Sequence, residues 1–368
     1  MARGGEEAPL RILAQYVARE FLKHFTFLVV AFVALYTLFD FIEKVDNFQE
    51  AGQGWATMLA FFVLQVPEIT TLLLPLAVLM ATVITLALMS KRNEIVAVKS
   101  SGISLFRFTL PILLLAALIT LGLAILNEVV VPRTKARTNY IWDVLVEKRP
   151  RRLSHKEKFW FKGQGSIYRV GYYDPLTQTL SDVTWYRFDR DFNLVERVDA
   201  RRIRFLGGRW VAFEGLDQRR LPGGGYAVRP FHQTVLNMPE RPQDFTRLAK
   251  PSEEMTFLEL KRYVERIEHE GYNARRYRVD LQARISYPFV CLIMALLGIP
   301  LALFREHGRA LAPAILMGLG AAVLYWIGFS YARSLFGYSG VLPPFAAAWL
   351  CNFVFAVAGL WLFTTIRQ

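Results

Sequence analysis

The sequence of 368 residues has little of what soluble enzymes use for chemistry. Its two cysteines, Cys291 and Cys351, lie in apolar runs, so we predict neither a disulfide framework nor a zinc site. Histidine occurs five times, and HEGYN and EHGRA lack metal-ligand spacing. The motifs GxxxxGK[ST], HExxH and GxSxG are absent. These absences argue against a metalloprotease, a serine hydrolase and a chain that binds ATP through its own P-loop.

Acidic residues are also fewer than basic ones. The sequence has 31 Asp and Glu and 44 Lys and Arg, which gives a formal net charge of +13. A basic excess of this size indicates an anionic partner. The basic residues adjoin apolar runs, and no nucleic-acid-binding motif is recognisable. We therefore expect anionic lipid or a phosphorylated substrate, and no nucleic acid.

What the sequence has in abundance is apolar residues, at 54% with a mean hydropathy of +0.27, concentrated towards the two ends. A helix that spans a bilayer needs roughly 20 mostly apolar residues. The long run that holds Pro67, Glu68 and Pro75 is predicted to be one helix, kinked or broken near the prolines, because two spans would leave the first too short. The charged N-terminus and long first run argue against a cleavable signal. Six spans are predicted, at about 21–42, 57–89, 108–131, 285–304, 310–333 and 342–366.

Lysine and arginine are unevenly distributed among the short loops. They are frequent before the first span, in 90–107 and after the fourth span, and rare after the first and fifth spans. By the positive-inside rule, both termini and residues 90–107 are then cytoplasmic. The long region between the third and fourth spans lies on the other side of the membrane, and long loops are exempt from the rule.

That middle region alternates polar and apolar residues in short stretches such as SDVTWYRFDRD and ARRIRFLGGRWVAFEG. Gly207-Gly208 between two such stretches predicts a β-hairpin. We predict an all-β domain, a sandwich or jelly roll, over 132–255, between spans one to three in 1–131 and spans four to six in 256–368. A linker helix is expected to begin at an N-cap, Thr256, and to stop at Gly271.

The stretch SKRNEIVAVKSSGIS, residues 90–104, predicts a short amphipathic helix over 91–102 that ends at Gly102 as a C-cap. Two interpretations stay open. The helix lies on the membrane surface, where its cations meet anionic lipid, or it docks in a groove of a cytoplasmic motor protein. Glu94 favours the second, because an acid gains nothing from anionic lipid but pairs with Arg or Lys of a protein.

This stretch resembles the (A/S)-x-R-x-E-(I/L)-x-x-(M/V)-x-(A/S)-x-G segment of the permeases of the lipopolysaccharide-export ABC transporter, the LptF/LptG type. EKVDNFQEAGQG, LNEVVVP and RYRVDLQARISYPF match further stretches of that family in the same order. The resemblance covers nearly the whole chain, including the arrangement of three spans, a β domain and three spans. VDNFQEAGQG is more similar to the LptG half of the pair than to the LptF half.

The resemblance implies a multi-pass inner-membrane permease of Gram-negative bacteria, with a periplasmic jelly-roll-like domain. It would extract lipopolysaccharide from the outer leaflet and pass it to a periplasmic jelly-roll bridge protein. It would form a heterodimer with a homologous permease above two copies of a cytoplasmic ABC ATPase, which would bind the ATP, so that the permease needs no cofactor, metal or catalytic residue of its own. Two alternatives stay open: a membrane-anchored scaffold whose β domain binds periplasmic proteins, and a permease of the same architecture for another lipid.

The family also suggests roles for individual residues. The match implies that spans one and five act as gate helices, and that the ATPase is contacted by a set of five residues: Arg92, Glu94, Ile95, Val98 and Gly102. Lipid A calls for an apolar wall with cations at headgroup height, although such residues are also ordinary interface anchors. The candidates for substrate binding are Phe32, Leu35, Phe39, Phe41, Lys44, Arg133, Lys135 and Arg137.

Three features complicate this assignment. Asp40 and Glu68 lie within or near spans, where an acidic residue can have a functional role. A polar contact between helices explains them at least as well, so no role is assigned to them. Glu43 stands where LptG-type proteins have a basic residue, and Lys44 is displaced by one position, which is about 100° on a helix. The phosphate contact is therefore expected from other residues.

Overall fold

A computed structural model describes residues 4–147, 159–163, 165–174, 177–189, 191–221, 223–242, 245, 252–269, 273–303 and 311–365. They form two compact units, one helical and one that contains the sheet, and the boundary in the third span falls between Arg137 and Thr138. The longer helices are α1 (Gly4–Glu50), α2 (Trp55–Lys91), α4 (Leu105–Ile125), α5 (Val131–Tyr140), α7 (Phe257–His269), α8 (Arg275–Ser286), α9 (Val290–Leu303), α10 (Leu311–Tyr331) and α11 (Pro344–Thr365), and the short α3 covers Glu94–Ser100.

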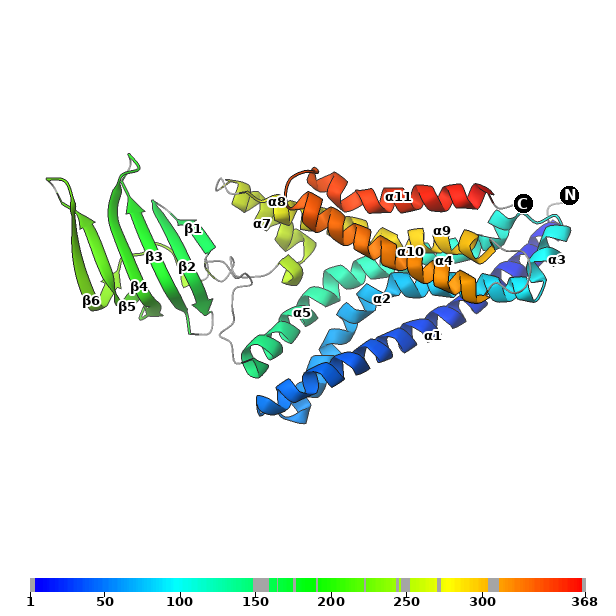
Figure 1. Cartoon of the computed structure of the whole chain (residues 1–368), viewed down its shortest axis with the longest axis horizontal. Helices are drawn as coiled ribbons and strands as arrows, with labels where there is room; N and C mark the ends of the chain where they lie inside the picture. Colours follow the sequence, from blue (N-terminus) through cyan, green and yellow to red (C-terminus); the bar gives the residue numbers. More distant parts are fainter. Residues whose placement is uncertain are drawn as a thin grey trace. The chain divides into compact units, whose positions relative to one another are not determined.

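In the described part of the chain, six helical segments are long and apolar enough to cross a membrane, which confirms the predicted count. They cover Arg11–Glu50, Trp55–Lys91, Leu105–Val146, Arg275–Leu303, Leu311–Gly337 and Pro344–Thr365. The second is a single helix, α2, as predicted, but the helix is not broken at Pro67 or Pro75. Figure 1 shows α3, the start of α1 and the end of α11 at the same end of the helical bundle.

The third span is longer than predicted. Pro132 has no amide hydrogen to donate, but it follows a π-helical turn over Leu126–Val130, a local widening that relaxes the hydrogen-bond ladder before the proline. The helix therefore continues through α5 and a second π-helical turn to Val146. The β domain was predicted to begin at Pro132, whereas the first described strand begins at Phe159.

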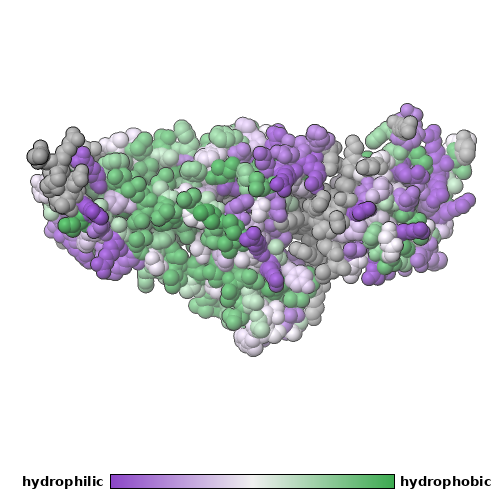
Figure 2. Space-filling view, turned by 180° about the vertical axis from the view of Figure 1, so that it is seen from behind, coloured by the Kyte–Doolittle hydropathy of each residue, from purple (hydrophilic) through white to green (hydrophobic). Residues whose placement is uncertain are grey.

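Helices α2 and α9 lie at the centre of the bundle. Val78 and Ala81 of α2 and Ala295 and Ile299 of α9 are fully buried in one apolar cluster. Cys291 and Cys351 are buried and free of disulfides, as expected for small apolar residues. Large apolar side chains also cover the outer surface of the helices, which suits a surface that faces lipid (Figure 2).

The second unit contains an antiparallel sheet in which each described strand pairs with the next in sequence. The prediction of an all-β domain is confirmed, although the described strands form a single meander and show no crossover to a second sheet. Gly207 and Gly208 have φ of 55° and 81°, so the predicted hairpin closes through a type I′ turn, which needs positive φ at both central positions. The strands are β1 (Phe159–Gly163), β2 (Ser166–Asp174), β3 (Thr179–Phe188), β4 (Leu194–Leu206), β5 (Arg209–Arg220) and β6 (Tyr226–Leu236).

The chain enters α7 through the predicted cap. The amide of Glu259 donates to Thr256 Oγ1 at 3.3 Å, and the amide of Thr256 donates to Glu259 Oε2 at 3.0 Å, a reciprocal capping box. The predicted stop at Gly271 lies outside the described residues. Helix α8 continues through a short 3₁₀ turn into α9, so the charged helix leads directly into the fourth span, as predicted.

Candidate functional site

The predicted helix over 91–102 is shorter in the structure, because α2 continues to Lys91 and Asn93 has a φ of 60° that ends it. Helix α3 then closes with a Schellman motif around Gly102, whose φ is 75°. The amide of Gly102 donates to the carbonyl of Lys99 at 3.0 Å, and the amide of Ile103 donates to the carbonyl of Val98 at 3.3 Å. The predicted C-cap is confirmed.

The apolar face of α3 is directed into the protein. Ile95 and Val98, which the family resemblance placed at the ATPase contact, are 5% and 8% exposed and belong to the core cluster of α1, α2 and α4. Their burial leaves them no surface for a partner protein, so they can serve coupling only by fixing α3 to the bundle. The large apolar side chain that α3 exposes is Val96, at 60%.

The carboxylate of Glu94 has partners within the same chain. The hydroxyl of Tyr16 on α1 donates to its two carboxylate oxygens at 3.2 and 3.1 Å, and Arg92 Nη1 lies 3.8 Å from Oε1. The Glu94 side chain remains 28% exposed and the Arg92 side chain 58% exposed, so both stay accessible to a partner. No sequence pattern indicates Tyr16 as a partner of Glu94, because Tyr16 lies 78 residues before Glu94 and contacts it only through the packing of α1.

The apolar candidates on α1 divide between two faces. Phe32, Leu35 and Phe39 are three and four residues apart and share one face, on which Leu35 is 52% and Phe39 64% exposed, while Phe32 packs partly into the bundle core. Phe41 lies elsewhere: its ring is 5.3 Å from that of Phe62, and it lines a groove of about 740 Å³ between α1 and α2.

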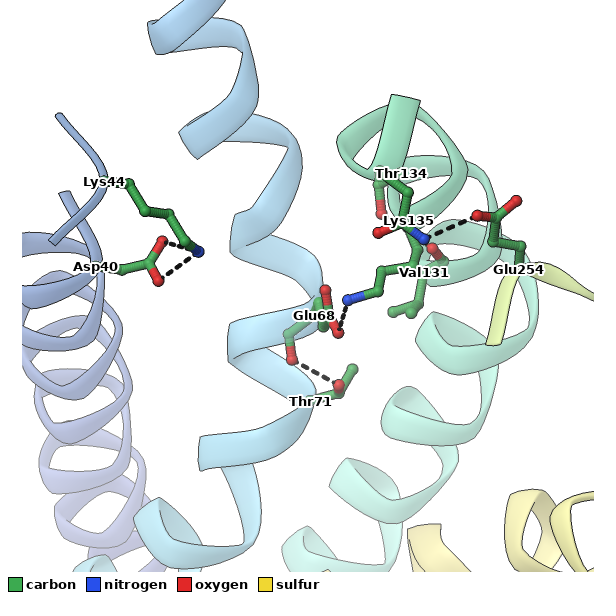
Figure 3. A network of polar contacts seen from close by, with 9 residues as sticks. Asp40, Lys44, Glu68, Thr71, Val131, Thr134, Lys135 and Glu254 are labelled. Carbon is green, nitrogen blue, oxygen red and sulfur yellow. Dashed lines mark hydrogen bonds and ion pairs between the residues drawn. The ribbon is translucent and has the colours of Figure 1, made fainter. Parts of the chain in front are cut away.

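Two of the four predicted cations are engaged in ion pairs (Figure 3). Lys44 Nζ donates to the two carboxylate oxygens of Asp40 at 2.6 and 2.9 Å, within α1. Lys135 Nζ donates to Glu68 Oε1 at 2.5 Å and thereby links α5 to α2. Asp40 and Glu68, to which the sequence assigned no role, are therefore the partners of two candidate substrate cations.

The other two cations, Arg133 and Arg137, are exposed, and neither has an ion pair within the described ranges of the chain. They are four residues apart on α5, so they project from the same face of the helix. The structure thus singles out these two guanidinium groups as positive charge that the described parts of the protein leave uncompensated.

Comparison with known proteins gives a match over almost the entire chain. A family profile described as "Lipopolysaccharide export system permease LptF/LptG" matches residues 15–365. The chain is 22% identical over 373 residues to lipopolysaccharide export system permease protein LptG of Escherichia coli strain K12, an alignment that covers 96% of this chain and 98% of that protein. The protein of the same name from Escherichia coli O6:H1 strain CFT073 is similar to the same extent. The match includes both helical halves and the sheet between them.

Proposed function

The chain belongs to the LptF/LptG family of lipopolysaccharide export permeases, and from this membership we propose that it acts as the LptG-like half of an inner-membrane transporter. It takes lipopolysaccharide from the outer leaflet and passes it to a periplasmic bridge protein of jelly-roll fold. A homologous permease completes the membrane part, and two copies of a cytoplasmic ATPase bind and hydrolyse the ATP. Both termini and α3 lie on the cytoplasmic side, and the β domain is periplasmic.

The position of α3 supports this proposal most directly. Ile95 and Val98 share one core with Val17 of α1, Met89 of α2 and Phe108 of α4. Because closely packed side chains transmit displacement, a force applied to α3 reaches three transmembrane helices at once. The groups that α3 and its N-terminal flank offer to an ATPase are a cation, an acid and an exposed valine: Arg92, Glu94 and Val96.

Glu94 tests this role. We expect Glu94→Arg to lower ATPase assembly or coupled lipopolysaccharide export while membrane insertion stays normal, because the variant replaces an acid with a cation beside Arg92. Tyr16→Phe is the matched control, since it removes the hydroxyl that donates to Glu94 and leaves the charges of Glu94 and Arg92 in place. Export by the Glu94→Arg complex at the wild-type rate contradicts the proposal. Equal losses in the two variants assign Glu94 an internal structural role.

On the periplasmic side, we propose that Arg133 and Arg137 contact the lipid phosphates, and that Leu35 and Phe39 form part of the apolar wall. The two arginines are exposed without an ion pair among the described residues, whereas Lys44 and Lys135 each have an acidic partner. Arg133→Gln combined with Arg137→Gln should reduce the lipopolysaccharide that co-purifies with the detergent-solubilised complex. Arg201→Gln combined with Arg204→Gln, an equal loss of charge on β4, is the control.

The same purification distinguishes the alternatives. A stoichiometric ATPase subunit supports a transporter, and its absence supports a membrane-anchored scaffold. A different co-purified lipid in place of lipopolysaccharide identifies a permease of the same architecture with another substrate.

A further inference from the structure

A second groove lies between residues 11–18 of α1 and residues 107–115 of α4. The start of α1 lies at the end of the helical bundle that carries α3 (Figure 1). The volume of the groove is about 640 Å³, within the range of roughly 300–1,000 Å³ that is typical of small-molecule sites. Ile103, three residues after the end of α3, forms part of the wall of this groove.

The charges of this groove are all positive. Arg11 and Arg107 line it, both are exposed, and neither has an ion pair within the parts of the chain that the structure describes. No acidic residue is found among the described lining residues. Gln15 is the remaining polar side chain among them, so an anionic group placed here meets two guanidinium groups and no opposing carboxylate.

The rest of the groove is apolar. Ala14 and Ala18 of α1 are small and leave space, and Leu110 and Leu114 of α4 are 36% and 62% exposed along it. Arg11 and Arg107 stand at or near the starts of two candidate membrane spans, Arg11–Glu50 and Leu105–Val146. The charged end of the groove therefore lies at headgroup height, and its apolar part enters the hydrocarbon region.

We propose that this groove binds an anionic phospholipid of the leaflet nearest to α3. The phosphate lies between Arg11 and Arg107, and one acyl chain lies along Ala14, Ala18 and Leu114. Basic pockets between transmembrane helices on the cytoplasmic side of a membrane bind anionic headgroups in this way. The bound lipid joins the start of α1 to the start of α4, on either side of the short α3.

This site is separate from the region proposed for lipopolysaccharide. Arg11 and Lys44 are 33 positions apart on the continuous helix α1, which at 1.5 Å per residue corresponds to about 50 Å. The proposal therefore depends neither on the identity of the exported lipid nor on an ATPase.

Native mass spectrometry of the full-length chain in detergent tests the proposal, with titration of phosphatidylglycerol or phosphatidylcholine of the same acyl chains. We expect phosphatidylglycerol to be retained more tightly than phosphatidylcholine. Arg11→Gln combined with Arg107→Gln should weaken phosphatidylglycerol binding about 25-fold, because each basic residue near an anionic headgroup contributes roughly fivefold. Ala18→Trp, which fills the groove, should weaken the binding of both lipids.

The matched control is Arg19→Gln combined with Lys23→Gln, which removes the same charge from exposed positions of α1 that do not line the groove. This control should leave phosphatidylglycerol binding unchanged. The proposal is overturned if the control weakens binding as much as the Arg11/Arg107 variant, or if the two lipids bind equally. It is also overturned if millimolar inorganic phosphate displaces phosphatidylglycerol, since the groove would then be a site for free phosphate.

Discussion

Arg333 and Asp280 form an ion pair in which the guanidinium donates through both Nε and Nη2, at 3.1 and 2.9 Å, to the same carboxylate oxygen. The hydroxyl of Tyr338 donates to that oxygen as well, at 2.6 Å. Asp280 is 5% exposed, and it lies on α8 while Arg333 lies in the π-helical turn that follows α10. The contact therefore fixes the end of the fifth span to the helix that begins the fourth.

Asp280→Asn should lower the free energy of unfolding by about 2 kcal/mol, because the buried carboxylate that pairs with Arg333 is lost, and the Arg333 side chain is only 35% exposed. Tyr338→Phe should lower the free energy of unfolding by about 1 kcal/mol, which is the usual contribution of one hydrogen bond. Thermal unfolding in detergent, followed by tryptophan fluorescence, measures both. Arg201→Gln is the control, since its pair with Glu214 has side chains 74% and 53% exposed and should contribute less than about 1 kcal/mol. An unchanged melting temperature for Asp280→Asn would contradict the prediction.

The same network predicts a pH dependence. Burial is the main reason that the pKa of Tyr338 rises to about 12; Asp280 raises it further, while Arg333 opposes the shift. A folded-state pKa above the unfolded value of about 10 means that the contribution of the phenol is complete below pH 10 and is lost as the pH rises through 12. The difference in melting temperature between wild type and Tyr338→Phe should therefore be constant from pH 7 to 10 and then shrink. A difference that already shrinks below pH 9 would be inconsistent with a raised pKa of Tyr338.

Charge exchange in the ion pair of Lys135 and Glu68 tests whether Lys135 has a structural role or binds the substrate. Glu68→Lys or Lys135→Glu alone should destabilise the protein by about 1 kcal/mol or more, because like charges then meet between α5 and α2. The double exchange restores opposite charges and should recover most of that loss in a thermal unfolding assay.

Lipopolysaccharide export by the double exchange then decides the role of Lys135. Export that returns together with stability shows that Lys135 acts through Glu68 and that the direct contact with lipid predicted for it is wrong. Export that stays low in the stable double variant shows that a cation is required at position 135 itself.

Local sequence signals predicted local structure well in this protein. Gly102, Gly207 and Thr256 were assigned as a cap, a hairpin turn and an N-cap, and each makes the expected geometry because a few neighbouring residues determine it. The six spans were recognisable for a similar reason, since each is long and continuously apolar.

Contacts between residues far apart in the chain could not be predicted from the sequence. Periodicity identified the apolar face of α3 but not that Ile95 faces the bundle, because the direction depends on how α1 and α4 pack around it. The partner of Lys135 lies 67 residues away in sequence, so no spacing rule indicates it. Family resemblance could assign Lys135 to the substrate, but only the packing of α5 against α2 shows that Lys135 is paired with Glu68.

Substitution of Gly102 tests whether the turn between α3 and α4 holds the end of α3 in place. An added Cβ at Gly102 would meet no atom within 4 Å, so the cost of Gly102→Ala comes from its φ of 75° alone, about 1 kcal/mol. Gly122→Ala is the matched control, because Gly122 also has open space but lies inside α4 without a positive φ, where alanine favours the helix. Gly102→Ala should lower both the melting temperature and the ATPase activity coupled to export, Gly102→Asn should lower them less, and Gly122→Ala should leave them unchanged or slightly raised. Equal effects of the two alanine substitutions would show that the left-handed backbone at Gly102 does not fix the end of α3.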